Sequence, residues 1–180
     1  MQTSIRGKSV AMISSDYFEE SELIETMAAI QDAGAHVDVI APHSGEIKGL
    51  KHTDPGQSVP VDITLDEMDP NKYDAIVLPG GAINADNLRM NDKARQIIRQ
   101  FMDAGKVVAA ICHAPWALVS AGRADGKQFT SFPTIQDDIR NAGGEWVNEE
   151  VVIDQNLITS RKPDDIPAFS HAVIQSLATA

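Results

Sequence analysis

The residues of this chain best suited to chemistry are Cys112 and His113, which stand side by side after the apolar run Val107-Val108-Ala109-Ala110-Ile111. Pro115 fits the first turn of a helix, so Cys112 falls where a strand passes into a helix. A tight turn of this kind exposes a nucleophile, the helix N-terminus favours a thiolate, and nearby backbone N–H groups can hold an oxyanion. The alternative for a lone cysteine is a small, buried apolar side chain.

His113 and Asp86 are the candidate partners of this cysteine. His113 could act as its base, although adjacent residues at a helix start point in different directions; otherwise it caps or packs. Asp86 could orient the histidine or cap a short turn.

Glu19 is the candidate acid. Beside a thiolate it would share one proton with the sulfur, and in protonated form it could donate a hydrogen bond and serve as a general acid. The alternative is a solvated charge that offsets the helix dipole. We interpret the other acids of this segment as solvated charges: Asp16, Glu20 and Glu22.

Short apolar runs alternate with helical patterns along the chain. Strands are expected at residues 10–13, 36–40, 74–78, 107–111, 151–153 and 157–160, with a hairpin or excursion between residues 42 and 70. Helices are expected from about residue 20 to 33, 92 to 104, 115 to 121, 134 to 141 and 166 to 177. The pattern predicts an α/β fold, a doubly wound flavodoxin-like sandwich with a mostly parallel sheet, in a single domain over residues 1–180.

In such a sheet the strands at residues 10–13, 74–78 and 107–111 are neighbours, so the loops after them converge. Gly80 and Gly81 lie in one of these loops, after Pro79, where a tight turn would aim backbone amides at the cysteine. Trp116 and Phe132 are expected to wall the pocket or the core. Arg161 and Lys162 could bind an anionic substrate group, although surface charge is the simpler interpretation.

Composition excludes several classes of function. The formal net charge is −11, which disfavours binding to nucleic acid or to an anionic membrane. No apolar run is long enough to span a bilayer. The glycine turn lacks the spacing of a nucleotide loop, the histidines show no metal-ligand spacing, and one cysteine allows no intramolecular disulfide. We therefore expect a cytoplasmic protein without metal or cofactor.

Four motifs in order carry a family resemblance: Phe18-Glu19-Glu20-Ser21-Glu22-Leu23, Asp74-Ala75-Ile76-Val77-Leu78-Pro79-Gly80-Gly81, Ala110-Ile111-Cys112-His113-Ala114-Pro115-Trp116 and Thr159-Ser160-Arg161-Lys162-Pro163-Asp164-Asp165. The chain resembles the PfpI intracellular protease-like (ThiJ/PfpI) family of the class I glutamine amidotransferase-like superfamily, over nearly its whole length.

The resemblance implies roles for these residues. Cys112 would be the nucleophile, His113 its partner, and Glu19 the glutamate that hydrogen-bonds the thiol. Asp86 would face the histidine from its own or a neighbouring subunit. Gly80, Gly81 and His113 would supply oxyanion amides. Homodimers or hexamers are implied.

Two departures from family patterns matter. Phe132 stands where some protease-like members have a tyrosine, which weakens a peptidase assignment. Ile111 and His113 beside the cysteine make amidotransferase activity a poor fit.

The leading hypothesis is a stress-protective cysteine enzyme that attacks aldehydes or glycation adducts, or hydrolyses peptides in damaged proteins, as deglycase, glyoxalase-like enzyme or peptidase. The alternative is a redox-sensing stress protein or chaperone whose Cys112 is oxidised without turnover. A third possibility is a structural domain with an ordinary thiol.

Overall fold

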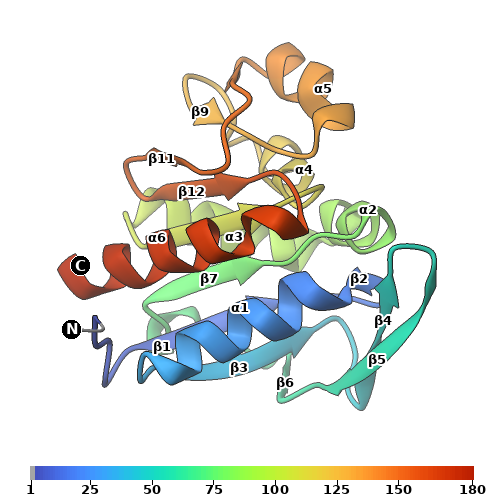
Figure 1. Ribbon diagram of the computed structural model, residues 1–180, viewed down its shortest axis with the longest axis vertical. Helices are drawn as coiled ribbons and strands as arrows, with labels where there is room; N and C mark the ends of the chain where they lie inside the picture. Colours follow the sequence, from blue (N-terminus) through green and yellow to red (C-terminus); the bar gives the residue numbers. More distant parts are fainter. Residues whose placement is uncertain (1–2) are drawn as a thin grey trace.

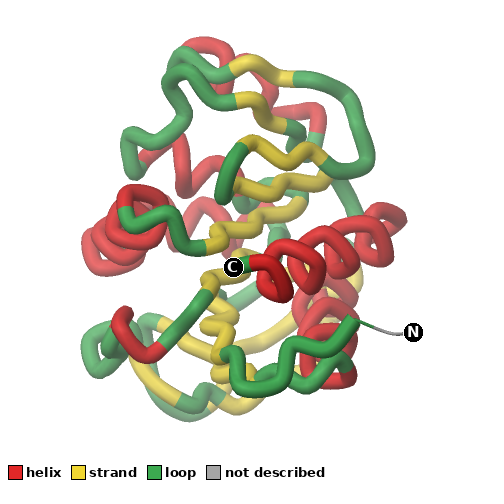
Figure 2. Tube along the Cα trace, turned by 90° about the vertical axis from the view of Figure 1, so that its left-hand side faces the viewer, coloured by secondary structure: helices red, strands yellow, loops and turns green. Residues whose placement is uncertain are grey.

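The computed structural model describes residues 3–180 of the chain. Its central sheet has seven strands in the order β11-β12-β8-β7-β1-β3-β6. The sheet is parallel except where β11 pairs antiparallel with β12. Helices cover both faces (Figures 1 and 2), which confirms the predicted doubly wound α/β class.

The strands are β1 (Ser9–Ile13), β2 (Phe18–Glu19), β3 (His36–Ala41), β4 (Glu46–Lys51), β5 (Asp54–Pro60), β6 (Ile63–Thr64), β7 (Ala75–Leu78), β8 (Val107–Ile111), β9 (Gln128–Phe129), β10 (Glu145–Trp146), β11 (Val152–Asp154) and β12 (Leu157–Ser160). The α-helices are α1 (Glu20–Asp32), α2 (Ala82–Met90), α3 (Asp92–Asp103), α4 (Pro115–Ser120), α5 (Gln136–Asn141) and α6 (Ile166–Thr179). Single 3₁₀ turns occupy Pro70–Lys72, Pro133–Ile135 and Pro163–Asp165.

Two apolar layers hold the helices to the sheet. Successive strand side chains point to opposite faces, so Met12 joins the layer under α1 and α6, whereas Ile13 joins the layer under α3 and α4. Phe169 and Phe101, each fully buried, are large side chains of the first and second layer respectively. Because both faces are covered, the inner strands β7 and β8 are apolar along their whole length, as the sequence pattern predicted.

The expected excursion between residues 42 and 70 contains a hairpin. Strands β4 and β5 pair antiparallel, and β2 adds to them in parallel to make a separate three-stranded sheet. Strand β2 was not predicted, because two residues are too few to show a period. This small sheet stands beside the carboxyl end of β1 (Figure 1).

Other short elements also escaped the sequence pattern. Helix α2 carries the polar residues Asn84, Asp86 and Asn87 and has no clear apolar stripe. Strands β9 and β10 form a two-residue parallel pair outside the central sheet. Within residues 3–180, no helix has the length and hydropathy needed to cross a membrane.

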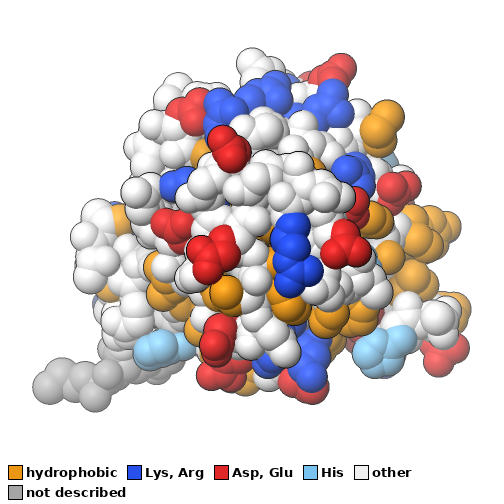
Figure 3. All heavy atoms as spheres, turned by 90° about the horizontal axis from the view of Figure 1, so that it is seen from above, with side chains coloured by type: hydrophobic (Ala, Val, Ile, Leu, Met, Phe, Trp, Pro, Cys, Tyr) orange, Lys and Arg blue, Asp and Glu red, His pale blue; other side chains and the backbone are white. Residues whose placement is uncertain are grey.

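The acidic excess is not gathered on the end of the molecule that carries β9 and α5. Viewed from that end, Asp and Glu side chains alternate with Lys and Arg side chains (Figure 3). Ion pairs in the described chain include the bidentate pair of Arg123 with Asp103, at 2.8 Å from Nε to Oδ1.

Helix α3 begins with an asparagine cap. Asn91 Oδ1 accepts a hydrogen bond from Ala94 N at 2.9 Å. We expect Asn91→Ala to lower the free energy of unfolding by about 1 kcal/mol, because one N–H group at the helix start loses its partner. Urea unfolding measures this. The control Asn87→Ala, at an exposed position of α2, should change stability by less than about 0.5 kcal/mol. Equal stabilities of the two variants would show that the cap contributes nothing.

Candidate active site

The predicted strand-to-helix junction is a strained turn. Cys112 follows β8 with φ of 64°, a left-handed conformation that is uncommon for residues other than glycine. Its N–H donates to Ser160 O at 3.0 Å, and its carbonyl accepts from Phe132 N at 2.8 Å. The backbone on either side of the sulfur is thereby fixed to two neighbouring segments.

A cavity of about 750 Å³ opens over this turn. Cys112 and His113 line it, with Phe132 beside them. The β4–β5 hairpin contributes His52, and the turn after β12 contributes residues 162–164. The convergence expected at the carboxyl ends of β1, β7 and β8 is confirmed: these strands are adjacent in the sheet, and the loops after them meet at Cys112.

Glu22, rather than Glu19, is the acid beside the thiol. Glu22 is fully buried on α1, and Gly80 N donates to its Oε1 at 3.1 Å. Glu22 also lies next to Cys112, since a Cβ on Gly80 would meet both Glu22 Oε1 and Cys112 Cβ. Within residues 3–180, the Oε2 atom has no hydrogen-bond partner. The interpretation of Glu22 as a solvated charge was therefore wrong.

Burial raises the pKa of Glu22 to about 8, and the negative charge of Glu19 adds to this shift. At neutral pH the Glu22 carboxyl is thus mostly protonated. The protonated acid beside the sulfur is therefore Glu22 and not Glu19, three residues further along the chain. A signal for it existed: Glu22, Thr26 and Ile30 are spaced by four residues on one helix face, and all three are buried.

Glu19 has a different contact. It precedes α1, and its carboxylate accepts from His52 N, at 3.1 Å to Oε2. His52 itself has φ of 58°. Glu19 lines the cavity, but its carboxylate holds the turn of the β4–β5 hairpin rather than the sulfur.

Gly80 and Gly81 occupy the tight turn that the sequence predicted. The N–H groups of Gly81 and His113 both favour the charged form of the Cys112 sulfur. A Cβ on Gly80 would lie 2.5 Å from Glu22 Oε1 and 2.6 Å from Cys112 Cβ, so no larger residue fits between acid and thiol. Gly81 has φ of 90°, which a residue with a Cβ rarely adopts.

Asn84 is a positioning residue that sequence reasoning missed. Its fully buried side chain donates to Pro79 O and Gly80 O at 3.0 and 2.9 Å, and its Oδ1 accepts from Ser15 N at 2.7 Å. It therefore ties the glycine turn to the loop after β1. A single asparagine carries no sequence signal that separates this role from an ordinary helix residue.

Burial determines the protonation of the thiol. The pKa of Cys112 is raised, first by burial and second by the charge of Glu22, and the two backbone donors only oppose these effects. The expected lowering by the helix start was wrong, because Cys112 is buried and α4 has only six residues. Because the thiol stays protonated at neutral pH, it needs a base to become a thiolate nucleophile.

His113 has the geometry of that base. Its Nδ1 lies 3.1 Å from Cys112 Sγ, and its Nε2 lies 3.2 Å from Thr134 Oγ1. Burial lowers the pKa of His113, so the ring is neutral and able to accept a proton. The left-handed turn at Cys112 allows two adjacent side chains to meet.

Asp86 does not orient His113 within this chain. It is exposed on α2, and within residues 3–180 the hydrogen bonds of the His113 ring are with Cys112 and Thr134. Phe132 lines the cavity as expected and stacks on His113, with ring centroids 4.7 Å apart. Trp116 lies behind the histidine at 5.9 Å and is not part of the cavity lining.

The two basic residues after β12 make different contacts. Lys162 lines the cavity, 3.5 Å from Asp164, whereas Arg161 pairs with Asp165. Among residues 3–180, no three His, Cys, Asp or Glu side chains come together as metal ligands do.

Comparison with known proteins identifies the family. A model of the DJ-1/PfpI family matches residues 8–176. The chain belongs to the DJ-1/PfpI family. The sequence resemblance is thereby confirmed.

Relatives within the DJ-1/PfpI family match along nearly the whole chain. Deglycase TK1284 of Thermococcus kodakarensis is 43% identical over 168 residues, 93% of this chain and 98% of that one. Protein/nucleic acid deglycase 2 of Escherichia coli is 38% identical over 173 residues, with coverage of 95% and 98%. The crystal structure of Drosophila melanogaster DJ-1beta superposes with a TM-score of 0.88 at 30% identity, covering 96% of this chain and 91% of that one.

Proposed function

We propose that this chain is a cysteine-dependent deglycase of the PfpI type, which removes carbonyl-derived adducts from amines or thiols. The observation that carries the proposal is the contact of Cys112 Sγ with His113 Nδ1, at 3.1 Å, on the wall of an open cavity. The deglycase names of its relatives support an enzyme of this class. They do not favour the redox-sensor alternative.

The first chemical step follows from the resting protonation states. Cys112 Sγ attacks the carbonyl carbon of the adduct and forms a C–S bond. The thiol proton passes to the neutral ring of His113 through Nδ1. The carbonyl electron pair moves to its oxygen, where the N–H groups of Gly81 and His113 can stabilise the charge. When the bond between the adduct and its amine or thiol later breaks, that leaving group takes its proton from the ring of His113.

Glu22 would keep the site electrically neutral. A carboxylate beside the sulfur would oppose the negative charge that develops during attack, whereas a carboxylic acid can donate a hydrogen bond to it. The raised pKa of Glu22, about 8, supports the second state at neutral pH.

We also propose that the chain forms homo-oligomers. Helix α2 exposes Ile83 and Met90 at 49% and 74%, with the exposed Asp86 between them. An exposed apolar pair of this kind suits contact with another copy. Light scattering coupled to size exclusion measures the assembly, and a mass of one chain at micromolar concentration would contradict it.

A substrate panel tests the proposed reaction. We expect the purified chain to remove methylglyoxal adducts from N-acetyl-lysine and N-acetyl-cysteine, followed by NMR, while an unmodified peptide stays intact. Cleavage of the peptide with no adduct removal would make the chain a peptidase. Oxidation of Cys112 by dilute peroxide, without turnover of any carbonyl, would instead favour the sensor.

A further inference from the structure

Arg161 and Asp165 form a closed clamp after β12. The guanidinium contacts Asp165 through two bonds, Nε to Oδ2 at 2.9 Å and Nη2 to Oδ1 at 3.0 Å. The backbone N–H of Arg161 also donates to Oδ2, at 3.0 Å. A further bond from Nη1 reaches Asn148 Oδ1 at 2.9 Å, so the arginine is held from both sides.

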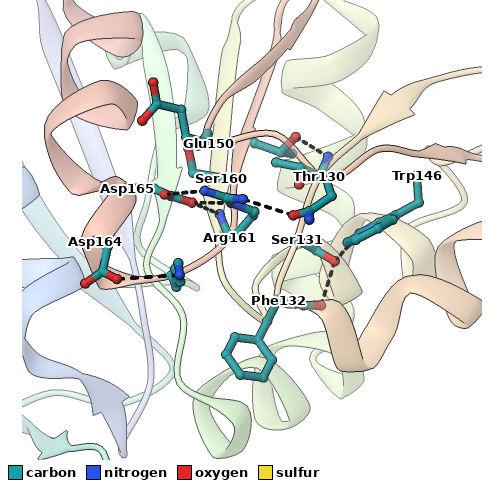
Figure 4. Close-up of polar contacts among 12 residues, drawn as sticks. Thr130, Ser131, Phe132, Trp146, Glu150, Ser160, Arg161, Asp164 and Asp165 are labelled. Atoms are coloured by element: carbon teal, nitrogen blue, oxygen red, sulfur yellow. Dashed lines mark hydrogen bonds and ion pairs between the residues drawn. The ribbon is translucent and has the colours of Figure 1, made fainter.

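The residues between the two ends of this clamp belong to the cavity. Lys162, Pro163 and Asp164 all line it, whereas the guanidinium of Arg161 is directed to Asp165 and Asn148. Figure 4 shows Arg161 joined to Asp165, with Asp164 set apart from this pair. A bidentate arginine–carboxylate pair has fixed geometry, so the pair determines where this wall of the cavity stands.

The clamp also places a buried charge. Asp165 is 3% exposed, and its negative charge is close enough to Glu22 to raise the pKa of that acid. The charge of Glu19 also raises the pKa of Glu22, so both of these neighbouring charges are negative. On the outer side, Glu149 and Glu150 act on Arg161. A buried carboxylate without its cation would add to the repulsion that a developing thiolate meets.

We propose that the Arg161–Asp165 pair is a positioning device for the reactive cysteine: it fixes the 162–164 wall of the cavity and cancels the charge of Asp165 beside the Glu22–Cys112 pair. Arg161 therefore acts through Asp165 and does not touch the substrate. The inference rests on the proposed role of Cys112 as the nucleophile. It gives a function to an arginine that the sequence left as surface charge.

The test is the rate of Cys112 alkylation by iodoacetamide between pH 6 and 10, followed by intact-protein mass spectrometry. Arg161→Gln leaves the charge of Asp165 uncompensated, which makes the thiol harder to ionise. The rate–pH curve should therefore move to higher pH by about 0.5 pH unit, which lowers the rate about threefold at a given pH. Asp165→Asn leaves the charge of Arg161 uncompensated and should move the curve to lower pH by a similar amount. The double variant should return to within about 0.2 pH unit of the wild-type curve.

The matched control is the surface pair Arg123–Asp103, which has the same bidentate geometry away from the cavity. Arg123→Gln and Asp103→Asn should leave the alkylation curve in place. Shifts of the same sign in R161Q and D165N, or no return in the double variant, would overturn the inference.

Two further outcomes are distinguishable. If R161Q does not fold, D165N still gives the sign of the shift in the alkylation curve. The double variant still shows whether the curve returns to that of the wild type. An unreactive Cys112 in the wild-type chain would instead overturn the proposed function, and this inference with it.

Discussion

Cys112→Ser should lower the rate of adduct removal by about a thousandfold or more, because a serine hydroxyl is a far weaker nucleophile than the thiol. His113 is a neutral base whose second nitrogen contacts a threonine, so little in this site could activate a hydroxyl group. The loss should appear in the turnover number, measured by NMR on the same adducts.

A displaced thiol provides the control. Ala178 is exposed on α6, so C112S/A178C restores one thiol per chain without restoring the site. This double variant should remain inactive, with a melting temperature close to that of C112S. Activity above one tenth of wild type in either variant would show that Cys112 is not the nucleophile.

Glu22→Gln should make folding stability less dependent on pH. The folded pKa of Glu22 is about 8, above its ordinary value of 4.5, so the folded chain binds the proton more tightly than the unfolded chain does. Its contribution to stability is fully present below about pH 4.5 and is lost as pH rises to about 8. That loss amounts to roughly 5 kcal/mol at most. Glutamine resembles the protonated acid but does not ionise, so the E22Q variant does not lose stability in this way as pH rises.

Urea unfolding at pH 5, 6, 7 and 8 measures this effect. The E22Q variant should gain stability relative to wild type as pH rises across this range. Glu25→Gln is the matched control, because Glu25 is an exposed residue of the same helix, and its difference from wild type should stay flat. A flat difference for E22Q would mean that Glu22 is already ionised at pH 5 in the folded chain.

The central sheet and its principal helices could be predicted because apolar residues repeat with clear periods. The run at Val107–Ile111 and the stripe of Ile97, Ile98 and Phe101 both lie in elements of the expected type. Helix α2 and strands β2, β9 and β10 could not be predicted in this way, because they are short or polar. Their positions depend on pairing with distant segments, such as Phe18 with Gly49.

The backbone geometry of the candidate site could be predicted better than the positions and protonation states of its acidic groups. Cys112, His113 and the glycine turn follow from the order of strand, turn and helix. The acid was misplaced, since Glu19 and Glu22 both begin the helix and only packing against Gly80 distinguishes them. The thiol pKa was misjudged because burial depends on the whole fold. The catalytic roles, the assembly and the cellular location remain predictions.

Because the chain contains one sulfhydryl, any thiol-directed reagent reports on a single atom. The mass gained per chain therefore counts the molecules that still carry a free thiol, and each measured rate can be divided by that count. Chains whose cysteine is already oxidised then cannot be mistaken for a slow enzyme.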